Sequence, residues 1–84
     1  MKLTASEVER FTHGTLVFGS AESVVDAVSI DTRTLERGDL FVAIRGPNHD
    51  GHDYITTALA SGAAGVVASQ PIESGAEFIR SRHV

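Results

Sequence analysis

The sequence predicts a small single-domain α/β fold, with a mixed sheet that contains a right-handed βαβ unit. Two continuous apolar runs, residues 40–44 and 65–68, have the composition of strands covered on both faces. Between them, residues 53–61 carry apolar side chains at helical spacing and end beside Gly62. Strand, helix and strand within about 30 residues indicate parallel strands joined by a right-handed crossover. We expect residues 1–84 to form one domain.

A short helix is expected over residues 5–12. It begins with a capping box, because the Thr4 hydroxyl can accept from the Glu7 N–H while the Glu7 carboxylate accepts from the Thr4 N–H. The helix should end at the His13–Gly14 pair, with Gly14 in the left-handed conformation that suits glycine. Local chemistry thus predicts both ends of this helix.

Shorter elements complete the predicted fold. Residues 15–18 and 27–31 have strand composition, residues 36–39 have turn chemistry, and residues 78–79 could add one more short strand. The strand at 27–31 should pair beside the strand at 40–44. The expected core comprises Val8 and Phe11 of the first helix, with Phe41, Val42, Ile44, Ile55, Leu59, Val66 and Val67.

Composition and charge exclude several classes of function. Seven basic residues against eleven acidic ones give a net charge of −4, and the scattered arginines form no basic stripe, so nucleic-acid binding is not expected. No apolar run approaches the roughly 18 residues of a membrane span. The chain has no cysteine and no GxxxxGK[ST] phosphate loop. We expect a cytoplasmic chain that holds no cofactor itself.

Two segments carry most of the candidate chemistry. Residues 31–33 lie where a half-buried strand ends, and residues 45–53 run from a buried strand into a helix. In open α/β sheets this edge is the usual ligand crevice, and a helix N-terminus with nearby arginines suits a small anionic ligand. The candidate ligand-binding residues are Ile30, Asp31, Thr32, Arg33, Arg45, Gly46, Asn48, His49, Asp50, Gly51 and His52.

Structural roles compete with these functional ones. Asp31 could form only an Asx turn and Asp50 only a helix N-cap, and Tyr54 is expected in the core. The histidines and aspartates of residues 49–53 are too closely spaced for the usual zinc patterns, so no metal site is expected. No serine or threonine has the context of a nucleophile elbow, and no catalytic residue is assigned.

Four motifs in order make a more specific pattern. They are residues 29–33 (SIDTR), 37–46 (RGDLFVAIRG), 50–55 (DGHDYI) and 62–67 (GAAGVV). This arrangement resembles the N-terminal domain of Mur ligases over most of residues 3–71. The sequence departs from the family pattern at Arg37, where proline is usual, and at Arg45, where lysine is common.

The resemblance implies a role in peptidoglycan precursor synthesis. Within the family the chain is most similar to ligases that add D-alanyl-D-alanine (the MurF type), because the opening helix followed by residues 13–17 resembles their start; ligases that add the third amino acid (the MurE type) are the alternative. In both, this domain would bind the UDP end of UDP-N-acetylmuramoyl-peptide. ATP and Mg²⁺ would bind in the remaining domains of the parent ligase.

Two other classes of function stay open at this point. One is a stand-alone small-ligand-binding or regulatory module that uses the same fold, for which the N-terminal domain of HPr kinase is a broadly similar case. The other is a protein-interaction domain in which Asp50 and Gly51 only shape their loop. A downstream reading frame with a GxxxxGK[ST] loop would favour the ligase over both.

Overall fold

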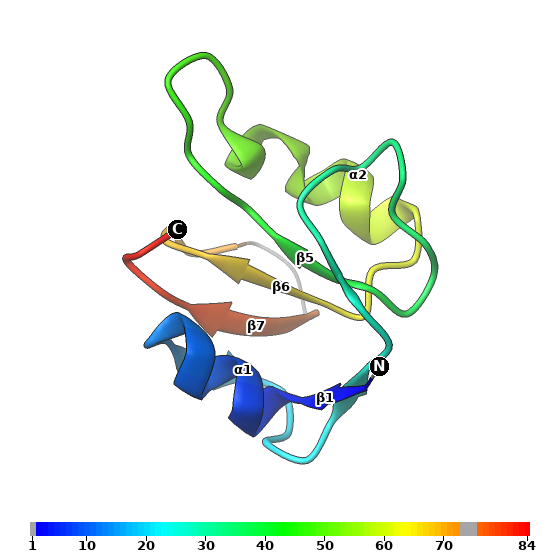
Figure 1. Ribbon diagram of the computed structural model, residues 1–84, viewed down its shortest axis with the longest axis vertical. Helices are drawn as coiled ribbons and strands as arrows, with labels where there is room; N and C mark the ends of the chain where they lie inside the picture. Colours follow the sequence, from blue (N-terminus) through cyan, green and yellow to red (C-terminus); the bar gives the residue numbers. More distant parts are fainter. Residues whose placement is uncertain (1, 73–75) are drawn as a thin grey trace.

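The computed structural model describes residues 2–72 and 76–84 and confirms the α/β class (Figure 1). The elements in chain order are β1 (Leu3–Thr4), α1 (Ala5–Thr12), β2 (Thr15–Phe18), β3 (Val24–Val25), β4 (Val28–Ser29), β5 (Leu40–Val42), the 3₁₀ helix η1 (Gly51–Tyr54), α2 (Ile55–Ala60), β6 (Gly65–Ala68) and β7 (Glu77–Arg80). One domain over residues 1–84 stays a prediction, and residues 1 and 73–75 of it lie outside the described residues.

The main sheet is mixed, with the strand order β2-β7-β6-β5-β4. The strands β4, β5, β6 and β7 pair in parallel, while β2 pairs antiparallel with β7 at one edge. The expected unit of two parallel strands joined by a helix is confirmed as β5, α2 and β6. The strands β1 and β3 form a separate antiparallel pair. The carboxyl ends of β4 and β5 therefore lie side by side, at the end of the sheet where a ligand is expected, and we call this the ligand edge.

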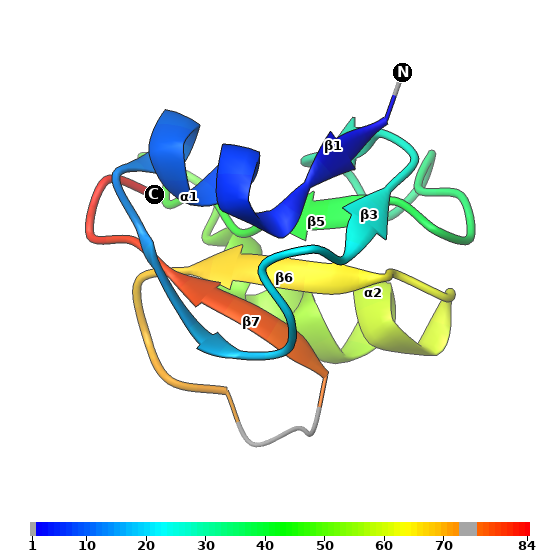
Figure 2. The same cartoon turned by 90° about the horizontal axis from the view of Figure 1, so that it is seen from below.

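Helices cover both faces of this sheet, as Figure 2 shows with α1 and α2 on opposite sides. Successive side chains along β6 point to opposite faces of the sheet and contribute to two cores. Val67 packs with the Ala5 and Val8 side chains of α1, and Val66 packs with Ala58 of α2. Both valines are fully buried. Burying each such side chain contributes about 1.5–3 kcal/mol, so β6 is central to the stability of the domain.

The capping box of α1 is confirmed, but one of its predicted core residues is not. The Thr4 Oγ1 accepts from the Glu7 N–H at 3.2 Å, and the Glu7 carboxylate accepts from the Thr4 N–H at 2.9 Å. Val8 is buried, whereas Phe11 is 70% exposed, so the prediction that Phe11 packs on the sheet was wrong. At 3.6 residues per turn Phe11 is rotated about 60° from Val8 and about 120° from Ala5, which points it away from the buried face.

The end of α1 also differs from the prediction. His13, not Gly14, adopts the left-handed conformation, with φ of +52°. Gly14 is required for another reason, since a Cβ there would lie 2.7 Å from the Ile79 Cγ2 and 2.9 Å from the Arg80 carbonyl oxygen. The glycine thus allows α1 to turn closely over β7.

The strands next to the ligand edge are shorter than predicted. β5 ends at Val42, although the Ala43 N–H still donates to the Val67 carbonyl at 2.8 Å. The chain then leaves the sheet, because the Ile44 carbonyl accepts from the Gly51 N–H at 2.8 Å and closes a loop. Ile44 is consequently 45% exposed, and its predicted place in the core was wrong.

The helix predicted over residues 53–61 is divided into η1 and α2. A 3₁₀ turn forms first because the Asp50 carboxylate accepts from the His52 N–H, which fixes a tight opening turn. The α-helical part begins at Ile55. Ile55 and Leu59 are only partly buried against the core, and so is Val42, while Phe41 is 1% exposed.

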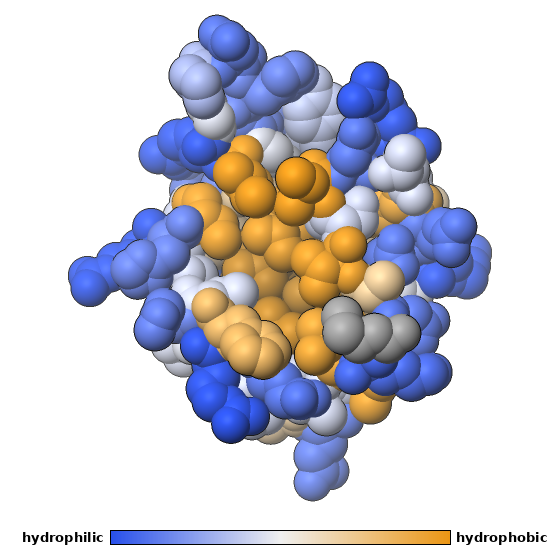
Figure 3. Space-filling view, viewed as in Figure 1, coloured by the Kyte–Doolittle hydropathy of each residue, from blue (hydrophilic) through white to orange (hydrophobic). Residues whose placement is uncertain are grey.

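Part of the sheet face on the α1 side is left uncovered. Val28 pairs in register with Leu40, so the two side chains share this face, and yet Val28 and the following Ile30 are exposed. Figure 3 shows apolar surface gathered near the centre of the face seen in Figure 1, with hydrophilic residues around it. An apolar surface therefore adjoins the ligand edge of the sheet.

The helices of the described residues are short. The α-helices contain eight and six residues, and neither has the length or the apolar character needed to cross a bilayer. The described part of the chain also contains no group of three or more histidine, aspartate or glutamate side chains placed to hold a metal ion.

Candidate functional site

The loop after β4 is built around Asp31. Its carboxylate accepts from the Arg33 N–H at 2.8 Å, which confirms the predicted Asx turn. The Asp31 carbonyl accepts from the Ser29 hydroxyl at 3.0 Å and from the Thr34 N–H at 3.2 Å. These bonds hold the Thr32 side chain at the turn, between two residues whose backbones are fixed.

Asp31 and Arg33 also form a close ion pair. The Arg33 Nη2 donates to the Asp31 Oδ2 at 2.8 Å, and the Arg33 Nε contacts both carboxylate oxygens at 3.1 and 3.2 Å. The Arg33 side chain and then its backbone N–H lower the pKa of the Asp31 carboxyl from 3.8 to about 2. The pair therefore stays ionised at neutral pH, and one edge of the guanidinium is committed to Asp31.

The loop after β5 folds back on itself. The Gly46 N–H donates to the His49 carbonyl at 2.6 Å, and residues 45 and 50 form an isolated antiparallel bridge. The Gly51 N–H reaches the Ile44 carbonyl. Figure 1 shows this loop projecting beyond β5 before the chain returns to η1. The backbone of this loop is thus closed by two hydrogen bonds, which together form the bridge between residues 45 and 50.

Asp50 organises the end of this loop. As predicted, it is an N-cap, accepting from the His52 N–H at 3.0 Å, and it also contacts the His52 Nδ1 at 2.7 Å. Hydrogen bonds from the His52 backbone and side chain, with the charge of Arg45 at 3.6 Å, lower the pKa of the Asp50 carboxyl. The His52 ring is buried, and its Nε2 lies 3.0 Å from the Ser69 backbone nitrogen.

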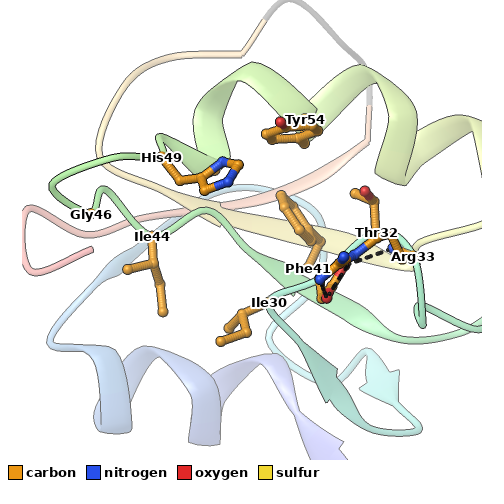
Figure 4. A pocket seen from close by; sticks show the side chains of 10 residues that line it. Ile30, Thr32, Arg33, Phe41, Ile44, Gly46, His49 and Tyr54 are labelled. Carbon is orange, nitrogen blue, oxygen red and sulfur yellow. Dashed lines mark hydrogen bonds and ion pairs between the residues drawn. The ribbon is translucent and has the colours of Figure 1, made fainter.

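The two loops enclose a pocket of about 530 Å³, a size typical of small-molecule sites. Figure 4 shows His49 and Tyr54 on one side, Ile30 and Ile44 on the other, and Phe41 between them. Seven of the predicted site residues line this pocket: Ile30, Asp31, Thr32, Arg33, Gly46, His49 and Gly51. The pocket therefore joins both segments that the sequence singled out.

Four predicted site residues do not line the pocket. Arg45 contacts Asp50 across the base of the loop, and Asn48 is exposed at its tip. Asp50 and His52 form hydrogen bonds with each other behind the pocket wall. These four residues shape the loop in this structure, whereas the seven others face the space that a ligand could occupy.

Three lining residues were missed by the sequence reasoning. Phe41 and Ile44 were assigned to the core, and Tyr54 was too, although Tyr54 is 39% exposed and its ring lies 6.1 Å from that of His49. Phe41 is both a core residue and a lining residue, because it is buried beneath the pocket. The useful signal was position: Tyr54 lies three residues after Gly51, and Ile44 follows a strand that ends at the ligand edge.

The pocket combines a flat apolar lining with a charged rim. The exposed rings of Tyr54 and His49 offer faces against which a planar heterocycle can stack, and the buried Phe41 lies beneath them. The Thr32 hydroxyl and the guanidinium of Arg33 provide hydrogen-bond donors nearby. A small ligand with an aromatic ring and a negative charge matches this arrangement.

Comparison with known proteins connects this chain to one family. Residues 24–82 match the profile described as the Mur ligase family, catalytic domain. The UDP-N-acetylmuramoyl-tripeptide–D-alanyl-D-alanine ligase of Synechocystis sp. is 37% identical over 93% of this chain and 18% of its own length. The UDP-N-acetylmuramoyl-L-alanyl-D-glutamate–2,6-diaminopimelate ligase of Bacillus licheniformis is 35% identical over 77% of this chain and 13% of its own length.

Similarity of fold agrees with similarity of sequence. A crystal structure of MurF from Acinetobacter baumannii superposes on 98% of this chain and 18% of its own chain, with a TM-score of 0.86 and 22% identity. The chain thus spans less than a fifth of the length of these relatives, which range from 13% to 18% coverage. Its profile match covers more than half of its residues, and the chain belongs to the Mur ligase family.

Proposed function

We propose that this chain is the domain of a Mur ligase that binds the UDP end of UDP-N-acetylmuramoyl-peptide. The observation that carries the proposal is the pocket at the carboxyl ends of β4 and β5, lined by residues of three of the four family motifs and by the neighbouring rings of His49 and Tyr54. A uracil ring is flat and a diphosphate is anionic, so both match the lining described above. The parent protein would be a cytoplasmic ligase of peptidoglycan synthesis.

In this proposal the parent ligase adds D-alanyl-D-alanine. Support comes from the D-alanyl-D-alanine ligase that is 37% identical over 93% of this chain, while a diaminopimelate ligase matches at 35% over 77%. The chain itself would not be catalytic. ATP and Mg²⁺ would bind in the remaining domains of the ligase, which agrees with the lack of a GxxxxGK[ST] sequence here.

Within the pocket we assign the uracil and ribose to the aromatic side and the turn at Thr32. The diphosphate would extend toward Arg33 and the loop of residues 45–51. Arg33 keeps one guanidinium nitrogen outside its bonds with Asp31, so it can still donate to a phosphate oxygen. Arg45, Asn48, Asp50 and His52 would contribute through the shape of the loop.

Titration of the chain with UDP, followed by amide chemical shifts, tests the proposal. We expect shifts in residues 30–33, 46–51 and 54. A second hollow, of about 610 Å³, lies elsewhere and is lined by His13, Thr15, Arg80, Arg82 and His83. Its positive charges make it the natural competitor for a diphosphate. Shifts confined to that hollow, or no shifts at millimolar UDP, would refute the assigned site.

A matched pair of variants sharpens this experiment. Thr32→Val removes a hydroxyl that lines the pocket, and we expect it to weaken UDP binding by roughly three- to tenfold. Thr34→Val is the control, because the Thr34 hydroxyl donates to the Asp31 carbonyl and does not line the pocket. Uridine and inorganic diphosphate, titrated separately, should shift the aromatic side and the charged rim respectively.

A further inference from the structure

His52 forms a buried connection between the pocket loop and the sheet. Its Nδ1 lies 2.7 Å from the Asp50 Oδ1, and its Nε2 lies 3.0 Å from the Ser69 backbone nitrogen and 3.1 Å from the Ser69 hydroxyl. The side chain of His52 is 6% exposed. Ser69 directly follows β6, 17 residues further along the chain. We call these contacts of Asp50, His52 and Ser69 the His52 bridge.

The partners of the ring determine where its proton lies. A backbone N–H can only donate, so the Nε2 that faces Ser69 must be an unprotonated acceptor. The Asp50 carboxylate, whose pKa is lowered by the His52 backbone N–H and side chain, can only accept, so the Nδ1 carries the proton. The His52 bridge therefore requires the neutral ring with its proton on Nδ1.

The same geometry excludes a hydrolytic triad, although an acid, an imidazole and a hydroxyl are in line. The single lone pair of the His52 Nε2 already receives the Ser69 N–H at 3.0 Å. It cannot also withdraw the proton of the Ser69 hydroxyl as a general base does. The His52 bridge therefore holds the pocket loop in place and does not activate a nucleophile.

We propose that His52 is a positioning residue that holds the pocket loop against β6 in the conformation that binds the ligand. His49 and Gly51 line the pocket and lie within three residues of His52. Through the His52 bridge, this part of the loop is connected to the end of a strand whose four residues are all buried. The inference rests on the proposed function, because it concerns the affinity of the same pocket.

Two substitutions separate the contact of His52 with Ser69 from its contact with Asp50. His52→Gln places an amide oxygen where it can accept from the Ser69 N–H, whereas His52→Asn can donate to Asp50 but is too short to reach Ser69. We expect His52→Gln to keep the dissociation constant for UDP within about threefold, and His52→Asn to raise it about tenfold or more. Equal effects of the two variants would overturn the proposal.

Two controls separate positioning from general destabilisation. Ser69→Ala retains the backbone N–H and should bind UDP as the unaltered chain does; a loss as large as that of His52→Asn would overturn the role given to the N–H. Thr4→Ala removes the N-cap of α1, away from the pocket, and should lower stability without changing affinity for UDP. A loss of affinity in Thr4→Ala equal to that in His52→Asn would show that stability alone governs binding.

Two further measurements need no ligand, so they test the positioning role of His52 even if UDP does not bind. The ¹⁵N shifts of the His52 ring should identify the tautomer with its proton on Nδ1, and the opposite tautomer would overturn the bridge. In His52→Asn, hydrogen exchange of the Gly46 and Gly51 amides should become about tenfold faster while that of Phe41 is unchanged. Unchanged exchange at both glycines would show that the loop does not depend on His52.

Discussion

Gly51 should not tolerate a side chain, whereas Gly46 in the same loop should tolerate one. Gly51 lines the pocket and donates its N–H to the Ile44 carbonyl at 2.8 Å. Gly46 lines the same pocket and is also bonded through its N–H. Replacing each with alanine adds one methyl group at two positions that differ chiefly in the space available. The pair therefore tests whether close backbone approach fixes this loop.

The magnitude follows from the contacts. A Cβ on Gly51 would lie 2.7 Å from the Ile44 nitrogen and 3.0 Å from the Ala43 Cα, and no side-chain rotation can relieve contacts with backbone. Such overpacking costs about 1–3 kcal/mol, offset by about 0.4–1 kcal/mol from the stiffer unfolded chain. We expect Gly51→Ala to lose about 1–2 kcal/mol. At Gly46 the nearest atom, the His49 carbonyl oxygen, is 3.3 Å away, so the two effects should nearly cancel.

Urea denaturation followed by circular dichroism measures both variants. Gly51→Ala should lower the midpoint without changing the slope, and its melting temperature should fall by about 5–15 °C, since 1 kcal/mol corresponds to about 4–8 °C in a domain of this size. Gly46→Ala should melt within a few degrees of the unaltered chain. If the two variants were equally stable, close approach at Gly51 would not be what shapes the loop.

Three further predictions concern single interactions. Arg33→Gln should raise the pKa of Asp31 from about 2 toward 3.8, measured by carboxyl NMR titration; in the unaltered chain the stabilisation from this pair is present above pH 3.8 and lost as the pH falls through about 2. A pKa that stays near 2 would mean that Arg33 is not its cause. Thr4→Ala should lower the free energy of unfolding by about 1 kcal/mol, whereas Ser6→Ala, exposed in the same helix, should change it by less than about 0.5 kcal/mol. Phe41→Ala should cost about 3–5 kcal/mol, a large share of the total for a domain of this length, and an unchanged urea midpoint would contradict its buried position.

The features predictable from sequence were those decided by neighbouring residues. The capping box of Thr4 and Glu7 and the Asx turn of Asp31 depend on side chains that reach only two or three residues along the chain. The strand at 65–68 was equally clear, because a short apolar run that follows a glycine is typical of a strand in the middle of a sheet. The pocket could be located for a similar reason, as parallel strands bring their carboxyl ends to one edge.

The features that sequence did not predict depend on distant parts of the chain. Phe11 and Ile44 are as apolar as their buried neighbours, but Phe11 is exposed because it is rotated away from the buried face of α1, and Ile44 because the chain leaves the sheet after β5. The contact of His52 with Ser69 joins residues 17 positions apart, which no local pattern encodes. Tyr54 was placed in the core for its helical spacing, but the 3₁₀ turn before α2 directs it to the pocket.

The uncovered side of the pocket limits how tightly this domain alone can hold UDP. Ile30 is 63% exposed, so a bound base would be enclosed mainly from the side of Tyr54 and His49. One face of a stacked ring buries roughly 100 Å² of apolar surface, which contributes about 2.5 kcal/mol. A charge-assisted hydrogen bond from Arg33 would add about 1.5–3 kcal/mol. Association also costs translational and rotational freedom, so these gains place the dissociation constant at about 0.1 mM or weaker. Isothermal titration should therefore find binding no tighter than this, and a submicromolar constant would mean that the pocket closes around its ligand in a way that this structure does not contain.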